Sequence, residues 1–397
     1  RSRGLGDVYK RQTVMYSQDG HPETNFRIVP VSPNAASLGT YGLIPTDNYV
    51  GQARISIPIY EIDLDGKKFP IALSYHTDGT RVAQEATWIG LGWTLQAGGC
   101  VVRQVQGTDD FAARGCYNLT DAPWLTNPRF EVTDQNLEKY MGYFKGDYDA
   151  EPDMFYFNAG GHSGSMYFDV LKNNRQLNAV PTIQTQEKVV KMVYNTSNKT
   201  WTMTDLEGYV YSFSTKEITY YFLNTIDFFQ TDITRSHIFP YYNEPQIVTA
   251  WMLDSVTSPN GGKIMFSYKK ESIFTPISTT EDVISLSKIV NGQLSSQSPQ
   301  YFTNKFNYNY SYSKIEQWTL SAITFEGGKV EFGTTDREDI ESAETGKKVQ
   351  KLSSIKVSDT AGNLIKTTML EYKYLLSGMA ATTNGYDDRL LLSKVYD

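Results

Sequence analysis

Residues Trp251 to Tyr268 read WMLDSVTSPNGGKIMFSY: an apolar run, a turn rich in Pro, Asn and Gly, and a second run that ends in aromatic residues. Two such runs around a Gly-containing turn are typical of a β-hairpin. Outward from this stretch the pattern recurs at Met154–Phe168, Trp201–Phe213, Trp318–Phe332 and Leu352–Tyr374. Because no amphipathic helix separates the copies, we predict an all-β fold with little helix, in which successive antiparallel hairpins form large rolled or stacked sheets.

The composition supports this prediction and excludes two classes of partner. Among 397 residues there are 28 Tyr, 19 Phe and 30 Gly, which favours pleated strands joined by tight turns. The formal net charge of −7 provides no basic surface, so nucleic acid is not expected as a partner. No run of about 18 apolar residues is present, so we expect no membrane span in this chain.

We divide the chain into six regions on composition and pattern. Residues 1–12 (RSRGLGDVYKRQ) resemble a translated sequencing-adapter scar of a metagenomic fragment and are excluded from the fold prediction. The remaining regions are an extended N-terminal segment (13–50), a Gly- and Trp-rich β head (51–150), a β-hairpin region (151–269), an insertion loop and strand (270–315), and a second β-hairpin region truncated at the C-terminus (316–397). Within the fourth of these, the Ser-, Thr- and Gln-rich stretch Ile273–Pro299 is predicted to be a loop.

The stretch Trp88–Gly99 (WIGLGWTLQAGG) combines two tryptophans with four glycines. This mixture suits a tight crossing at which one backbone approaches another under large aromatic side chains. We therefore predict structurally critical positions at Trp88, Gly90, Gly92, Trp93, Gly98 and Gly99.

Several of these residues also resemble the opening of bacterial RHS/YD-repeat proteins. The resemblance rests on Pro33–Gly39 (PNAASLG), Ile55–Tyr60 (ISIPIY), Leu73–His76 (LSYH), Trp88–Trp93 (WIGLGW), Ala97–Gly99 (AGG), Glu151–Asp153 (EPD) and Gly161–Gly164 (GHSG). It covers about residues 31–397 and is most specific in the first hundred positions. The same region is distantly similar to the N-terminal domain of toxin-complex B subunits and to the Salmonella virulence-plasmid protein B family.

The resemblance implies a β-rich region that precedes YD repeats, which build a hollow shell around a variable C-terminal cargo, often a toxin. This chain departs from the full pattern, because it has no repeated Tyr-Asp unit, no RHS core motif and no C-terminal effector. The expected partners are therefore the downstream YD-repeat core and effector of the same full-length chain. The resemblance implies a secreted or cell-surface location, with the signal peptide lost together with the true N-terminus.

No motif predicts catalysis or a cofactor. Gly161–Ser165 (GHSGS) approaches the nucleophile elbow Gly-x-Ser-x-Gly, but Ser165 stands where the second glycine belongs, and a hairpin turn explains it better. The four histidines lack a second ligand at metal-binding spacing. A glycosidase would need two facing acids, and no spacing selects a pair. We expect a chain that is not an enzyme.

Two further features have alternative interpretations. Asp147, Asp149, Glu151 and Asp153 alternate and would share one face of an extended chain, where they could bind Ca²⁺ or simply be solvated. The two cysteines, Cys100 and Cys116, could form a disulfide or remain buried thiols.

Tyrosines alternate along two predicted strands, at Tyr209 and Tyr211 and at Tyr308, Tyr310 and Tyr312. Exposed, they would form a ladder for stacking sugars, and the chain would be a carbohydrate-binding or adhesin-like surface domain. Buried, they would be cross-strand pairs that pack one sheet on the next. We predict the second arrangement, and with it a non-enzymatic structural module of a secreted or surface RHS/YD-repeat protein.

Overall fold

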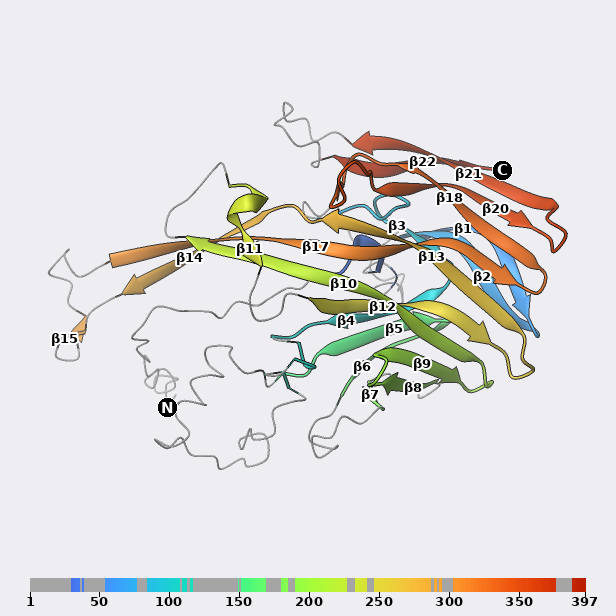
Figure 1. Cartoon of the computed structure of the whole chain (residues 1–397), viewed down its shortest axis with the longest axis horizontal. Helices are drawn as coiled ribbons and strands as arrows, with labels where there is room; N and C mark the ends of the chain where they lie inside the picture. Colours follow the sequence, from blue (N-terminus) through green and yellow to red (C-terminus); the bar gives the residue numbers. More distant parts are fainter. Residues whose placement is uncertain are drawn as a thin grey trace, which may run out of the picture.

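The computed structural model describes residues 30–35, 38, 54–76, 84–107, 109–112, 115–116, 149, 151–168, 180–184, 190–226, 233–240, 246–286, 289–290, 293–294, 303–375 and 388–397. The fold is all-β, as predicted (Figure 1). Within these residues, no helix is long and apolar enough to cross a membrane.

A small sheet has the strand order β1-β2-β3, with β1 at Arg54–Leu64, β2 at Lys67–His76 and β3 at Trp93–Gln96. The β1–β2 hairpin turns at Asp65 and Gly66, which both have positive φ. An Asp-Gly turn of this kind has a backbone twist that matches that of the paired strands.

The main sheet contains the remaining long strands. Its first half comprises β4 (Gly99–Gln104), β5 (Met154–Ala159), β6 (His162–Tyr167), β7 (Thr182–Ile183), β8 (Val190–Asn195), β9 (Thr200–Asp205), β10 (Val210–Ile226), β11 (Phe239–Pro240), β12 (Ile247–Thr257) and β13 (Lys263–Phe274). Its second half comprises β14 (Ser278–Leu286), β17 (Thr303–Phe325), β18 (Gly328–Asp336), β19 (Glu341–Ser342), β20 (Gln350–Ser358), β21 (Leu364–Leu375) and β22 (Arg389–Tyr396). The short strands β15 (Ile289–Val290) and β16 (Gln293–Leu294) pair separately, and η2 (Arg235–His237) is a single 3-10 turn.

All five predicted hairpins of the main sheet are present, as β5–β6, β9–β10, β12–β13, β17–β18 and β20–β21. The loop predicted at Ile273–Pro299 was wrong at Ser278–Leu286, which is strand β14 and pairs with Thr303–Ser311 of β17; residues 295–299 lie outside the described residues. The Ser- and Thr-rich sequence of β14 resembles that of a loop, but a long partner strand completes the hydrogen bonds of its backbone.

The main sheet splits in the middle. Strand β10 pairs with both β12 and β17, and β13 also pairs with both, so these strands close a ring in which β12 and β17 lie across from each other. Two aromatic side chains reach into the split. The indole N–H of Trp318 donates to the carbonyl oxygen of Lys216 (2.7 Å), and the Tyr268 hydroxyl donates to that of Leu253 (2.6 Å).

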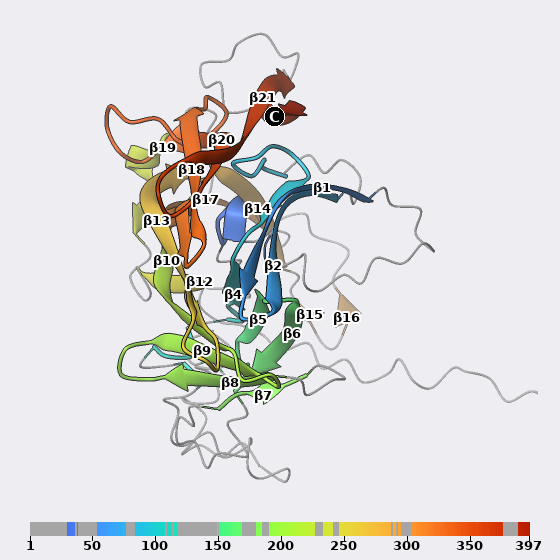
Figure 2. The ribbon, with the colours of Figure 1, turned by 90° about the vertical axis from the view of Figure 1, so that its right-hand side faces the viewer.

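Residues 30–35 and Leu38 pack beside this split, and we call them the strap. Pro33, Asn34, Ala35 and Leu38 are helical, so the extended conformation expected for residues 13–50 was wrong at these positions. Figure 2 shows this short turn between the curved main sheet and the strands β1 and β2. The strap therefore lies in the space between the two sheets.

The core is aromatic and extends across both sheets. Ile62, Ile71 and Leu73 of the small sheet belong to the same buried cluster as Phe155 and Trp251 of the main sheet. Most rings of this cluster meet at edge-on and tilted angles, and Phe168 stacks on Trp201, with centroid separations from 4.8 Å to 6.3 Å; the set includes Phe155, Phe168, Tyr194, Trp201 and Trp251. These contacts stabilise the fold beyond the apolar area that they bury.

We expect Phe155→Ala to lower the free energy of unfolding by about 3–5 kcal/mol, because it leaves a cavity in this cluster. Chemical denaturation would measure the change. Leu206→Ala is the control, because Leu206 is 79% exposed, and its effect should stay within about 0.5 kcal/mol. Equal effects of the two substitutions would contradict the aromatic core.

Candidate functional site

The Gly- and Trp-rich segment joins the small sheet to the main sheet. The Leu91 N–H donates to the carbonyl oxygen of Leu390 in β22 (2.8 Å), and the Leu352 N–H of β20 donates to that of Trp88 (2.9 Å). The Thr87 hydroxyl closes the local turn by donating to the Trp93 carbonyl oxygen (2.7 Å). The predicted crossing thus connects strands that are more than 250 residues apart in the sequence.

Both tryptophans of the segment pack against other elements. Trp88 is buried, and its ring lies 6.5 Å from that of Phe332. Its backbone N–H donates to Oδ1 of Asn34 in the strap (2.9 Å). The half-buried ring of Trp93 lies 5.3 Å from that of Tyr75 in the paired strand β2.

The glycines of the segment have the close contacts or positive φ that the sequence predicts. A Cβ at Gly90 (φ +115°) would lie 2.8 Å from the backbone nitrogen of Leu392. A Cβ at Gly92 (φ +76°) would lie 2.7 Å from the ring of Tyr75. Gly98 also has positive φ, at +109°, and a Cβ at Gly99 would meet the backbone of β5 at 2.4 Å. Any other residue would strain the backbone, displace a neighbour, or both.

We call the turn from Ala86 to Trp93, which contacts β20 and β22, the junction turn. A buried ion pair completes its contacts with the main sheet. Nη2 of Arg337 lies 2.7 Å from Oδ2 of Asp339, and both side chains are almost fully buried. The guanidinium also donates to the carbonyl oxygens of Thr87 (3.1 Å) and Ala86 (3.2 Å), and Oδ2 of Asp339 accepts from the Leu390 N–H (3.0 Å). The pair therefore bridges the junction turn, the loop after β18 and strand β22.

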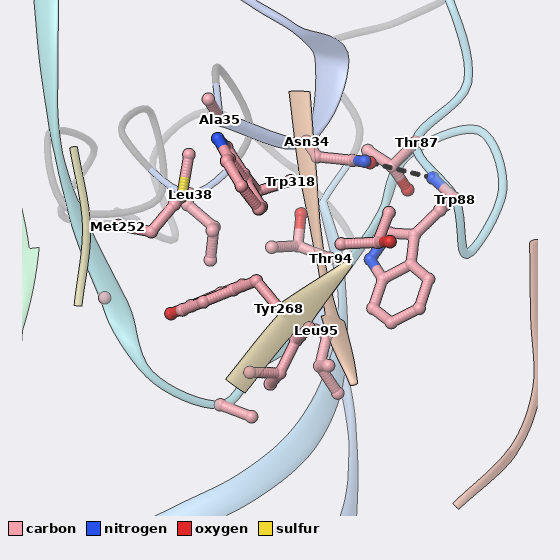
Figure 3. A pocket seen from close by; sticks show the side chains of 14 residues that line it. Asn34, Ala35, Leu38, Thr87, Trp88, Thr94, Leu95, Met252, Tyr268 and Trp318 are labelled. Atoms are coloured by element: carbon pink, nitrogen blue, oxygen red, sulfur yellow. Dashed lines mark hydrogen bonds between the residues drawn. The ribbon is translucent and has the colours of Figure 1, made fainter. Parts of the chain in front are cut away.

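A small cavity lies where the strap meets the junction (Figure 3). Asn34 and Ala35 of the strap face Trp88, Thr94 and Trp318 across it. A larger cavity of about 220 Å³ lies between the two sheets. Its lining is mainly apolar and includes Phe69, Ile71, Ile264, Phe266 and Ile323. The residues that line both cavities are Leu38, Thr94, Ala97 and Gly99.

The acidic residues suggested for Ca²⁺ are placed differently from one another. Asp147 lies outside the described residues. Glu151 is exposed, whereas Asp149 and Asp153 are buried. Oδ1 of Asp149 accepts from the Glu151 N–H (2.9 Å). In the described part of the chain, no three His, Cys, Asp or Glu side chains form a group that could hold a metal ion.

Asp153 instead binds a buried guanidinium. Nε of Arg103 in β4 donates to Oδ2 of Asp153 (2.8 Å), and its Nη2 contacts both Asp153 and Asp109. Burial, and then the charge of Asp153, raise the pKa of Asp110 to about 9, so that Asp110 is mainly neutral at pH 7. The sequence analysis missed this cluster, because Arg103 lies about 50 positions from Asp153 and only the pairing of β4 with β5 brings them together.

The tyrosine ladders face the interior. Tyr209, Tyr211, Tyr310 and Tyr312 are at most 8% exposed, and Tyr308 is half-buried. The possibility of an exposed stacking ladder was therefore wrong for the four buried rings. Tyr312 stacks on Phe222 of β10 with parallel planes 4.5 Å apart between centroids, and Tyr209 and Tyr211 lie against Phe69 of the small sheet.

A third ion-pair cluster joins the two sheets beside Tyr209 and Tyr211. Nζ of Lys67 in β2 lies 2.6 Å from Oδ2 of Asp205 in β9 and 3.0 Å from Oε2 of Glu207. Burial opposes the charge of Lys67, but its hydrogen bonds to Asp205 and Glu207 outweigh this effect and raise its pKa. The hydroxyl of Tyr211 donates to the same Asp205 oxygen (3.1 Å). The positive charge of Lys67 is thus balanced by Asp205 and Glu207 between the two sheets.

Cys100 and Cys116 are both buried thiols, so the disulfide considered as one alternative does not form in this structure. Cys100 packs with Val102, Ala250 and Met252 as a small apolar side chain. Burial raises the pKa of its thiol, which disfavours the reactive thiolate.

Comparisons with known proteins find only distant similarity. No family model matches the chain, and no curated protein matches it. Among solved structures, TcdB2-TccC3-Cdc42 aligns with a TM-score of 0.35 at 11% identity, over 87% of this chain and 15% of that chain. A mutant Tc holotoxin pore of Photorhabdus luminescens aligns with a TM-score of 0.34 at 10% identity, over 87% of this chain and 14% of that chain. The structural similarity to Tc toxin chains is thus weak, and this chain spans about one seventh of their length.

We expect Gly92→Val to lower the free energy of unfolding by at least about 2 kcal/mol, because it adds backbone strain and a clash with Tyr75. Gly261→Val is the matched control: Gly261 has φ +95°, and nothing lies within 4 Å of a Cβ there. Gly261→Val should introduce backbone strain without a clash, and therefore lower the free energy of unfolding by less than Gly92→Val. Thermal unfolding of both variants measures the difference, and an unchanged midpoint for Gly92→Val would refute the close packing at this glycine.

We expect Arg337→Met to cost about 3–5 kcal/mol of stability, since it leaves the buried Asp339 carboxylate without its guanidinium. The control is Lys329→Met, which removes one partner of the exposed pair Lys329–Glu331 and should cost less than about 1 kcal/mol. Urea denaturation at neutral pH measures both changes. A small effect of Arg337→Met would show that the junction does not depend on this pair.

Proposed function

We propose that this chain is a non-enzymatic structural module of a secreted or surface RHS/YD-repeat protein. In this role it contributes a section of β wall to a shell that encapsulates or displays a C-terminal effector. Its partners are the downstream YD-repeat core and effector of the same full-length chain. The motifs of residues 33–164 that resemble this family are the basis for the family part of the proposal.

The burial of the aromatic ladders is the observation that carries the proposal. Tyr209 and Tyr211 pack the small sheet on the main sheet. Tyr310 and Tyr312 are buried in β17, which pairs with β14, and Tyr312 stacks on Phe222 of β10. A sugar-binding surface would need such rings on the outside. Their position favours a role in holding layers of sheet together.

The buried charges support the same role. Asp153 and Asp339 are each bound by a guanidinium and by backbone N–H groups. Carboxylates held in this way stabilise the fold. A hydrolase instead needs acids that face each other across an open cleft. The arrangement favours a non-enzymatic module.

The test is protease protection in the full-length protein that carries this chain. We expect Arg337→Met to make the C-terminal region susceptible to trypsin under conditions in which the wild-type shell protects it, because local opening of the wall exposes its contents. Lys329→Met is the control and should retain protection. Mass spectrometry of the fragments measures both.

Two results would contradict the proposal. One is a C-terminal region that stays protected although cleavage shows that the module itself has opened. The other is saturable binding of the isolated chain on a glycan array, which would favour the carbohydrate-binding alternative.

A further inference from the structure

The strap is held by polar contacts from its backbone and small side chains and by apolar contacts. The Thr219 hydroxyl donates to the carbonyl oxygen of Pro30 (2.9 Å), and Asn158 Nδ2 donates to that of Leu38 (2.9 Å). Asn34 accepts from the Trp88 N–H (2.9 Å). Apolar contacts come from Val31, Ala35 and Leu38, which pack with the cluster that contains Cys100 and Met252. A segment held in this way can detach without unfolding the sheets.

The carboxyl group of Glu217 lies directly beneath the strap. Glu217 is fully buried in β10, and its Oε1 accepts from the backbone N–H of Ser32 (2.8 Å) and from the Thr249 hydroxyl (3.1 Å). Its Oε2 is buried with no hydrogen-bond partner in the described part of the chain. A carboxylate at this position would be a buried charge without a counter-ion, which costs several kcal/mol.

We propose that the strap, residues 30–35 with Leu38, is a proton-controlled latch that docks over Glu217 while its carboxyl group is neutral and detaches when this group ionises. The docked strap excludes water from Glu217, and detachment lets water reach it. Docking is therefore coupled to the binding of one proton. This inference is independent of the proposed shell function.

The direction of the pH dependence follows from burial. Burial raises the pKa of docked Glu217 above its ordinary value of 4.5, despite the hydrogen bonds from Ser32 and Thr249 that lower it. Between pH 4.5 and this raised pKa, the docked state holds a proton that the detached state has lost. Docking is therefore strongest at acidic pH and weakens as the pH rises, by about tenfold for each pH unit in this range.

The groups around Glu217 do not offset its charge. The strap contributes Ser32 and β12 contributes Thr249, and neither titrates. Strand β4 contributes the Cys100 thiol, whose pKa is raised by burial and then by the charge of Glu217, so it stays neutral. Glu217 is therefore the group in this part of the described structure whose ionisation the strap controls.

Detachment would also open the space between the sheets. Leu38 lines both cavities, so its removal would enlarge the pocket at Trp88 and the apolar cavity of about 220 Å³. The lining of this cavity includes the partly exposed Phe69 and the buried Phe266, so detachment would increase the accessible apolar surface. The latch thereby couples pH to exposure of an apolar surface, which the dye ANS would report.

Hydrogen–deuterium exchange from pH 4.5 to 8 tests the latch, with each rate corrected for intrinsic exchange. Peptides that contain Ser32 and Trp88 report the two sides of the docked strap. We expect their protection in the wild type to fall by about tenfold per pH unit above pH 4.5 until the strap is detached. Glu217→Gln, which mimics the neutral carboxyl group, should keep protection constant and prevent the rise in ANS fluorescence.

Two controls separate the latch from general loosening. Glu61→Gln makes the same chemical change at an exposed side chain of β1 and should behave like the wild type. Asn34→Ala removes the bond to Trp88 and should lower protection by the same factor at every pH, with the slope retained; this comparison holds even if Glu217→Gln fails to fold. Wild-type protection that does not vary with pH, or an equal slope in folded Glu217→Gln, would overturn the proposal.

Discussion

The close approach of backbones at the Gly- and Trp-rich segment is the constraint on which the rest of the structure depends. At Gly90 the main chain of the junction turn contacts that of β22, and at Gly99 the main chain of β4 contacts that of β5. A Cβ at either position would collide with the facing main chain, so the strands would have to move apart. The small sheet can cover the aromatic core of the main sheet only because the Gly- and Trp-rich segment that connects them lets the backbones approach closely.

Three buried ionic clusters brace this arrangement: Arg337 with Asp339, Arg103 with Asp153, and Lys67 with Asp205. Each joins elements that the chain order separates. Burial of such charges is costly, so these pairs contribute little net stability relative to an apolar core, but they strongly disfavour alternative registers that would leave one partner alone. We infer that they specify how the layers fit, while the aromatic rings supply most of the stabilisation.

The split in the main sheet differs from the rest of the sheet in how its strands are connected. Across the split the side chains of Trp318 and Tyr268 reach carbonyl groups on β10 and β12. The strap covers the same region and leaves Glu217 with one oxygen unsatisfied. The strap also contacts the core cluster itself, because its Asn34 accepts from the backbone N–H of Trp88.

The amino-acid sequence was enough to predict those elements whose causes are local. Alternating apolar runs around Gly-containing turns fix each hairpin, and glycines between tryptophans indicate a close crossing, because both depend on neighbouring residues. Only the tertiary structure decided which faces are buried, that Ser278–Leu286 finds a partner strand, and that Asp153 binds Arg103 rather than solvent. The physical reason is that burial and charge pairing depend on partners far away in the sequence, such as Trp88 and Leu352 or Ser32 and Glu217, which only strand pairing and layer packing bring together.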